Sequence, residues 1–234
     1  MVGRRLILIP PSEGKAPGGN GPPWTAATMK VDALDPMRRV LLGSVSGTVV
    51  DSKAPTMAAI DRYTGVLYRE LDPASIKGQA RRRMQRDVMV ASGLWGLVAP
   101  TDPIPYYRLK MAASVDGLGR LSTWWRDELS IALAPHARAA AVWDLLPNEH
   151  SAALNWTSIP RSRRITVRFV DRSERVVSHW NKLLKGSLVR WLVETGARHP
   201  EDLAEVELPG GYRLDPLASS LDDRRAEVVM RQHP

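Results

Sequence analysis

The sequence predicts a single domain of mixed α/β or α+β class, in which helices surround a mixed β-sheet. Short apolar runs alternate along the chain with amphipathic segments of helical period, so strands and helices are not segregated. There is no internal repeat and no linker long enough to separate two domains, so we expect one domain over residues 1–234. With 44% hydrophobic residues, a chain of 234 residues can bury a substantial core.

The predicted strands are short apolar runs or alternating segments. Residues 4–9 form an apolar run that Pro10 and Pro11 end, which is typical of a buried strand. Residues 165–180 alternate on both arms around a polar turn, which predicts a β-hairpin. Residues 226–231 predict a strand at an edge of the sheet. Further strands are expected at 88–92 and 139–147.

Amphipathic segments between these strands predict helices. They are expected at 33–45, at 55–71 with a break near residues 61–65, at 80–87, at 121–137 and from 181 to about 196.

The last of these helices has an unusual basic face. Asn181 is its expected N-cap, and Gly196 is expected just beyond its C-terminal end. Leucines at 184 and 188 share the core face, and the opposite side carries Lys182, Lys185, Gly186 and Arg190. A glycine within a helix costs about 1 kcal/mol relative to alanine. Gly186 therefore indicates that another group, such as a bound anion, approaches the backbone closely there.

Composition excludes several classes of protein. The chain has no cysteine, which excludes disulfides, thiolate catalysis and cysteine-based metal sites. Its five histidines lack metal-ligand spacing, so we expect no metal and no cofactor. No run of eighteen apolar residues is present, and the N-terminal segment lacks a signal-peptide pattern. We expect a cytoplasmic protein that does not cross a membrane.

The net charge of +8 favours an anionic partner such as DNA or a nucleotide. The basic residues concentrate in 76–87, 159–169 and 175–190. The alternative is that these residues form an ordinary solvated surface.

Two loops carry candidate binding groups. Residues 11–24 follow the first strand and contain Ser12 and Lys15, but they lack the spacing of a P-loop. Residues 100–111 are rich in proline, which would hold Asp102, Tyr107 and Arg108 in place. Arg108 could grip a phosphate and Tyr107 could stack on a base, with Trp95 as a neighbour of the ligand. Alternatively, Asp102 caps a turn and pairs with Arg108.

A carboxylate and an imidazole follow the predicted strand at 139–147. Asp144 or Glu149 could form a general acid/base pair with His150. The alternative is a helix start, with Asn148 as the N-cap and Glu149 complementing the helix dipole.

Several segments together resemble the YaaA family of bacterial peroxide-stress proteins, in its actinobacterial branch. They are "LILIPPSEGK" (6–15), "IDRYTGVLYREL" (60–71), "ASGLWGLVAPTDPIPYYRLKM" (91–111), "LSTWWRDEL" (121–129), "VVSHWNKLLKGSLVRWLV" (176–193) and "GGYRLD" (210–215). The resemblance implies a mixed α/β fold with a helix-hairpin-helix-like element, DNA binding, and a role in limiting free iron under hydrogen peroxide. It implies no catalytic mechanism.

The chain departs from the family pattern at two places. Ala99 stands where the family has an arginine, and His150 within "LPNEH" (146–150) stands where the family has a tyrosine. The "RYTG" segment fits the hairpin of the implied element, with Gly65 allowing phosphate to approach the backbone. The usual first glycine is absent, and a plain turn between helices is the alternative.

The leading hypothesis is a peroxide-stress protein that binds DNA or a nucleotide-like anion in a basic cleft. The binding residues would be Ser12, Lys15, Arg62, Tyr63, Gly65, Tyr107, Arg108, Ser178, Asn181, Lys182 and Lys185.

Two alternatives remain open. The first is an enzyme acting on a small nucleobase- or nucleotide-like substrate, with Asp102, His179 and Lys185 as candidate catalytic residues and Asp102 or His179 moving the proton. The second is a protein that acts through a partner, which would present a large exposed apolar patch.

Overall fold

The computed structural model describes residues 4–159, 162–175 and 180–233. It contains a nine-stranded mixed sheet in the order β10-β11-β13-β9-β8-β1-β3-β4, with β12 paired to β13. Its strands are β1 (Arg4–Ile9), β3 (Val88–Ser92), β4 (Gly96–Val98), β8 (Ala140–Asp144), β9 (Arg163–Val170), β10 (Glu207–Leu208), β11 (Tyr212–Leu214), β12 (Ser220–Leu221) and β13 (Arg225–Gln232). The mixed α/β fold of one domain that the sequence predicts is confirmed.

The centre of the sheet is parallel. β1 pairs with β3 on one side and with β8 on the other, and the parallel arrangement continues through β9 to β13. β3 and β8 are buried along their whole length, and β1 from its second residue onward. Parallel strands covered on both faces have near-continuous apolar sequences, which is why these runs could be recognised.

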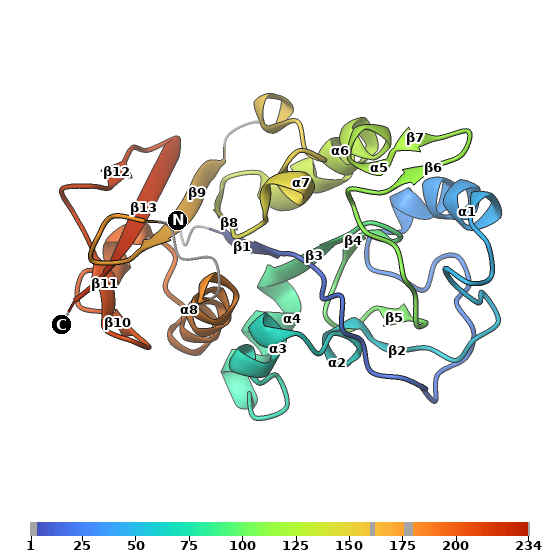
Figure 1. The fold of residues 1–234 in the computed structure, drawn as a ribbon, viewed down its shortest axis with the longest axis horizontal. Coiled ribbons are helices and arrows are strands. Elements are labelled where there is room, and N and C mark those ends of the chain that lie inside the picture. The colour runs from blue at the N-terminus through green and yellow to red at the C-terminus, as the bar shows by residue number, and fades with distance from the viewer. Residues whose placement is uncertain (1–3, 160–161, 176–179, 234) are drawn as a thin grey trace.

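Helices cover both faces of this central part (Figure 1). Helices α5, α6 and α7 lie on one side of the strands, and α3, α4 and α8 lie on the other. The helices are α1 (Asp35–Ser44), α2 (Ala59–Arg62), α3 (Val66–Leu71), α4 (Gly78–Asp87), α5 (Leu121–Trp124), α6 (Arg126–Ala137), α7 (Asn148–Ser151) and α8 (Asn181–Thr195).

Smaller elements complete the described chain. The short sheets are β2 (Met57–Ala58) with β5 (Pro103–Ile104) and β6 (Ser114–Val115) with β7 (Gly119–Arg120), and the 3-10 turns are η1 (Asp32–Leu34), η2 (Trp156–Ser158) and η3 (Pro200–Leu203).

The order of the parallel strands contains a switch point. From β1 the chain passes to β3 on one side, and it then returns across β1 to place β8 on the other side. The segments that follow β1 and β8 therefore leave the sheet in opposite directions at their carboxyl ends. In open α/β sheets this is where ligands bind.

Helix α8 packs against α3, and Gly186 explains how closely. A Cβ atom at Gly186 would overlap the carbonyl oxygen of Leu67 and lie 2.8 Å from Cβ of Glu70. The close approach expected at Gly186 is therefore made by α3 and not by a bound anion. Trp180, and not Asn181, is the N-cap, and it makes no capping side-chain bond.

The C-terminal end of α8 is as expected. Gly196 caps the helix with φ of 82° and ψ of 12°, and its N–H donates to the carbonyl of Leu192. Left-handed backbone costs an L-residue about 1–2 kcal/mol. Gly196→Ala is expected to lower the free energy of unfolding by about 1–2 kcal/mol in urea titrations. Gly47→Ala, where a Cβ meets open space at ordinary φ, should change it by less than about 0.5 kcal/mol.

The structure places β13 differently from the prediction and describes only part of the expected hairpin at 165–180. β13 was expected at an edge, but it lies between β9 and β11 and also pairs with β12. The expected hairpin at 165–180 has its first arm in β9 and its polar turn at 171–175, where the Asp171 N–H donates to the Arg175 carbonyl. Most of its second arm, 176–179, lies outside the described residues. No helix in the described chain is long and apolar enough to span a membrane.

Candidate functional site at the carboxyl ends of β1, β3 and β8

Polar groups follow three neighbouring parallel strands where those strands end. We call this the carboxyl edge: the last residues of β1, β3 and β8 together with the segments 10–15, 92–93 and 144–150. Ser12 and Lys15 follow β1, Ser92 ends β3, and Asp144 ends β8. The N–H of Leu145 donates to the carbonyl of Leu8 at 3.0 Å, so the chain after β8 begins beside the end of β1.

Lys15 is held by three contacts at this edge. Its Nζ donates to the carbonyl oxygen of Ser12 at 2.8 Å. The same atom lies 4.2 Å from the ring centroid of Tyr107 and 5.7 Å from that of Tyr63. Among the residues that the structure describes, no carboxylate pairs with it within 4 Å. Burial lowers the pKa of Lys15 to about 8, with Glu13 acting in the opposite direction.

The two tyrosines form a buried hydroxyl chain with Ser92. The Tyr107 hydroxyl is 2.9 Å from that of Tyr63 and 2.8 Å from Oγ of Ser92. Burial raises the pKa of Tyr107 to about 12, so its hydroxyl stays protonated at neutral pH. Tyr107 is fully buried, so in this structure its ring supports Lys15 and has no face free to stack on a base. Ser92 was not singled out from the sequence, although a serine that ends an apolar strand is a signal for it.

A second partly buried lysine lies beside the end of β8. Lys185 extends from α8, and its Nζ donates to the carbonyl oxygen of Leu145 at 2.8 Å. Burial lowers the pKa of Lys185, while the charge of Asp144 acts to raise it. Lys15 and Lys185 thus hydrogen-bond to carbonyls on the two sides of the switch point.

Exposed charges lie near Lys15. Lys110 pairs with Glu13 at 2.8 Å, and this hydrogen bond lowers the pKa of Glu13. Lys182 and Lys15 lower it further, and Glu149 raises the pKa of Lys110 in addition to the larger effect of Glu13. The segments after β1 and β8 and the start of α8 therefore share one electrostatic environment.

Asp144 does not pair with His150. Its Oδ2 accepts from Nη2 of Arg164 at 2.6 Å and from Oγ of Ser151 at 3.2 Å. Arg164 also lies over the Trp156 ring, with Cζ 4.1 Å from the centroid. The carboxylate therefore holds α7 onto β8 and β9, and Asp144 is not the carboxylate partner of His150.

His150 is buried without a partner. Its side chain is 9% exposed, its Nδ1 lies 3.7 Å from Oε1 of Glu149, and neither ring nitrogen has a hydrogen-bond partner among the described residues. Burial lowers the pKa of His150 and keeps the ring neutral, although Glu149 opposes the shift. Pro147 is the N-cap of α7 and makes no side-chain cap, so the expectation of an Asn148 cap was wrong.

The "RYTG" segment joins α2 to α3 and packs on the loop after β1. The N–H of Thr64 donates to the carbonyl of Gly14, and a Cβ at Gly65 would overlap the Ser12 side chain. Arg62 is fully buried, and its guanidinium donates to the carbonyls of Ala16, Pro55 and Ile104. Its N–H groups therefore point to backbone carbonyls inside the protein. A contact with DNA phosphate would instead need these groups at the surface.

The Pro-rich loop distributes its polar groups separately. The Asp102 carboxylate accepts from the N–H groups of Ala99 and Lys30, so it caps a turn, and burial raises its pKa. Arg108 is exposed and donates to the Tyr106 hydroxyl at 3.1 Å, not to Asp102.

Of the remaining predicted residues, one is buried in the core and two lie outside the part of the chain that the structure describes. Trp95 is fully buried, and its ring lies 5.2 Å from that of Trp24. Ser178 and His179 lie outside the described residues. In the described chain, no group of three histidine, aspartate or glutamate residues could hold a metal ion.

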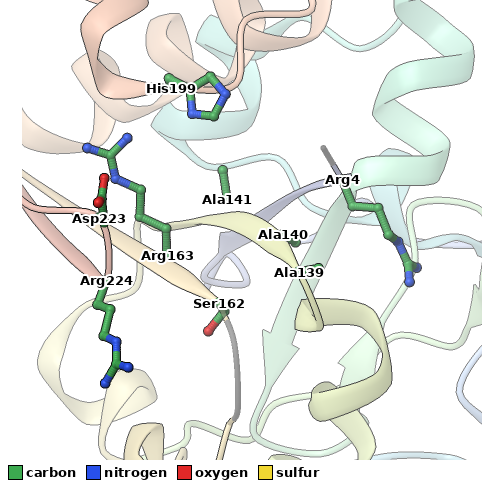
Figure 2. Close-up of a pocket in the computed structure, with 9 residues that line it drawn as sticks. All are labelled: Arg4, Ala139, Ala140, Ala141, Ser162, Arg163, His199, Asp223 and Arg224. Carbon is green, nitrogen blue, oxygen red and sulfur yellow. The ribbon is translucent and has the colours of Figure 1, made fainter. Parts of the chain in front are cut away.

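A cavity of about 420 Å³ lies at the opposite, amino-terminal edge of the sheet (Figure 2). Arg4, Ala140 and Arg163, the first residues of β1, β8 and β9, form part of its lining. Arg163 is already bidentate to Glu201 and donates to two backbone carbonyls, so four of its five N–H donors are occupied. Because the lysines with lowered pKa values lie at the carboxyl edge, we place the candidate site there.

Comparison with known proteins assigns the chain to a family. The sequence model described as peroxide stress protein YaaA matches residues 44–218. A UPF0246 protein of Streptomyces coelicolor is 35% identical over 94% of this chain and 95% of its own. A UPF0246 protein of Corynebacterium glutamicum is 31% identical over 90% and 94%, respectively. This chain is therefore a member of the YaaA peroxide stress protein family.

Proposed function

We propose that this chain binds a nucleotide-like anion at the carboxyl edge, between Lys15 and Lys185. The observation that carries the proposal is this pair of partly buried ammonium groups, one on each side of the switch point, neither paired with a carboxylate within 4 Å in the described chain. Removing an ammonium from water is costly unless an opposite charge compensates it. A bound phosphate or carboxylate would supply that charge and raise both lowered pKa values.

The contacts of the segment between α2 and α3 favour a small anion over duplex DNA. A helix-hairpin-helix contact would use Arg62, which is fully buried, and Gly65, which packs against the Ser12 side chain. The net charge of +8 still attracts polyanions without specificity, so duplex DNA belongs in the test as a competing ligand.

Calorimetric titration with adenosine 5′-monophosphate tests the proposal. Lys185→Met removes one of the two charges and should weaken binding at least tenfold. Lys77→Met is the matched control, because Lys77 also donates to a backbone carbonyl, that of Ala74 at 2.7 Å, but is exposed at the start of α4. It should change the affinity less than twofold.

Titration with a 20-base-pair duplex at two salt concentrations separates the alternatives. Duplex binding that falls steeply with salt and weakens equally in both variants, with no detectable binding of adenosine 5′-monophosphate, would indicate a surface interaction with DNA and contradict the proposal. Undetectable binding of both ligands at low salt would also contradict it.

The enzyme hypothesis has one specific observation in its favour. A lysine with a pKa of about 8 has the chemistry of a nucleophile or general base. The partner hypothesis gains less support, because the large exposed hydrophobic side chains of the described chain lie on four separate segments: Val40, Ile131, Trp180 and Leu217.

A further inference from the structure

We propose that His150 is a proton-binding group that regulates the carboxyl edge, so that acidification strengthens the binding of an anion there. The inference rests on the proposed function for the anion itself. It goes beyond that function by giving a regulatory role to a residue that does not touch the anion.

The side chain of His150 is buried in a way that leaves its polar atoms unused. It is 9% exposed, and neither ring nitrogen has a hydrogen-bond partner among the described residues. Its backbone is paired normally, since its N–H donates to the Pro147 carbonyl and its own carbonyl accepts from the Ala153 N–H. Buried polar groups are almost always hydrogen-bonded, because an unpaired one is costly. The unused nitrogens therefore indicate a second state of the protein, in which the ring carries a proton and a partner.

A partner for the protonated ring lies next to it in the chain. Oε1 of Glu149 is 3.7 Å from Nδ1 of His150, which is beyond hydrogen-bonding distance. The Glu149 side chain is 46% exposed, so it is free to move toward the ring. A proton on Nδ1 turns that nitrogen into a donor, and the carboxylate of Glu149 then accepts from it. Protonation thus replaces a buried, unpaired ring by an ion pair.

The other charged groups around α7 are already engaged. Asp144 on β8 pairs with Arg164 on β9 at 2.6 Å. Arg126 on α6 donates to the carbonyl of Ala152, just beyond α7. Burial lowers the pKa of His150, and among the described residues the charge of Glu149 is the one that raises it. Glu149 is therefore the group through which protonation of His150 acts.

The charge of Glu149 is shared with the lysines of the carboxyl edge. It raises the pKa of Lys110, after the larger effect of Glu13, which is paired with Lys110 at 2.8 Å. Glu13 in turn lies in the field of Lys15 and Lys182. While His150 is neutral, the negative charge of Glu149 repels an incoming anion. When His150 is protonated, the pair is neutral, so the net charge of the carboxyl edge rises by one and the anion binds more strongly.

The coupling works in both directions. If a proton on His150 strengthens anion binding, the bound anion must strengthen proton binding by the same factor. Anion binding therefore raises the pKa of His150. Because burial holds this pKa below the ordinary value of about 6.5, the effect appears in acid, below about pH 6.5. The affinity for the anion is lowest above that pH, where the ring is neutral, and increases as the pH falls.

Calorimetric titration at pH 8 and pH 5 tests the coupling. Adenosine 3′,5′-cyclic monophosphate is the probe, because its phosphodiester keeps a single negative charge throughout this range. The affinity of the unmodified chain should rise at least threefold from pH 8 to pH 5. His150→Phe keeps a ring in the core but cannot bind a proton, so its affinity should rise less than 1.5-fold. His136→Phe is the matched control: His136 lies on α6, burial lowers its pKa as well, and the threefold rise should remain.

Two further measurements do not depend on the fold of His150→Phe. Glu149→Gln imitates the neutralised carboxylate, so it should raise the affinity at pH 8 about threefold and leave little further rise at pH 5. Nuclear magnetic resonance of the imidazole groups in the unmodified chain should show a His150 pKa that increases when the probe saturates the protein. A His150 pKa that the probe does not move, or a pH dependence that His150→Phe retains, would overturn the inference.

Lys185→Met separates this inference from the proposed function. Binding that Lys185→Met weakens, with a pH dependence that His150→Phe leaves intact, would support the anion site and overturn the role of His150. A pH dependence that His150→Phe removes, with binding that Lys185→Met does not weaken, would support the role of His150 and count against the site between the two lysines. No detectable binding of the probe at either pH would overturn both.

Discussion

Asp87→Ala is expected to lower the free energy of unfolding by about 3–5 kcal/mol, because it leaves a buried guanidinium without its counterion. Nη2 of Arg5 donates to Oδ2 of Asp87 at 2.7 Å, and the two side chains are 2% and 4% exposed. The remaining bonds of Arg5, to the carbonyls of Leu192 and Ala197, do not neutralise its charge. Arginine stays charged even when burial lowers its pKa, as it does here.

Urea unfolding at pH 7 measures this loss, and an exposed pair provides the control. Arg213 and Glu207 also form an ion pair, but their side chains are 60% and 51% exposed. Glu207→Ala should therefore cost less than about 1 kcal/mol. The double variant Arg5→Met with Asp87→Leu removes both charges and should be more stable than Asp87→Ala alone. A loss below 1 kcal/mol for Asp87→Ala would show that water reaches Arg5.

Gly186→Ala is expected to destabilise the protein by about 2 kcal/mol. Alanine improves helix propensity by about 1 kcal/mol. Overpacking a tight contact costs up to about 3 kcal/mol, and here the new methyl group meets the Leu67 carbonyl, which cannot rotate away as a side chain would. The steric cost therefore exceeds the gain in propensity.

Gly43→Ala is the matched control for Gly186→Ala. Gly43 lies within α1, and a Cβ there meets no atom within 4 Å. This variant should stabilise the protein by up to about 1 kcal/mol, so thermal unfolding should move the two midpoints in opposite directions. Equal shifts in the same direction would mean that α3 and α8 separate easily.

The sequence predicted which segments form strands and helices better than it predicted which of these elements lie side by side. The apolar runs of β1, β3 and β8 and the periodicity of α1 and α6 are local signals, and the structure confirms them. Strand order depends on pairing between distant segments, so neither the interior position of β13 nor the switch point beside β1 was visible. Periodicity likewise placed Gly186 away from the leucine face of α8 but could not identify α3 as its second contact.

For the candidate site, too, the sequence indicated individual residues but not the contacts they make after folding. Residue type and loop position indicated Lys15 and Lys185, and the structure places them beside the ends of adjacent strands. Residue type alone could not show that the side chains of Asp102 and Arg62 form their hydrogen bonds with backbone groups. That depends on which carbonyls and amides fall within reach after folding.

The interior position of β13 has a consequence for synthesis on the ribosome. Ile7 pairs with Val88, and Leu8 pairs with Asp144. One side of β9 becomes paired with β13 only when residues 225–232 have emerged. Until then, β9 presents unpaired N–H and C=O groups along that side, as an edge strand does. From the emergence of β9 until residues 225–232 follow, the nascent chain therefore carries an open template for mispairing, and the completion of β13 is the step that covers this side of β9.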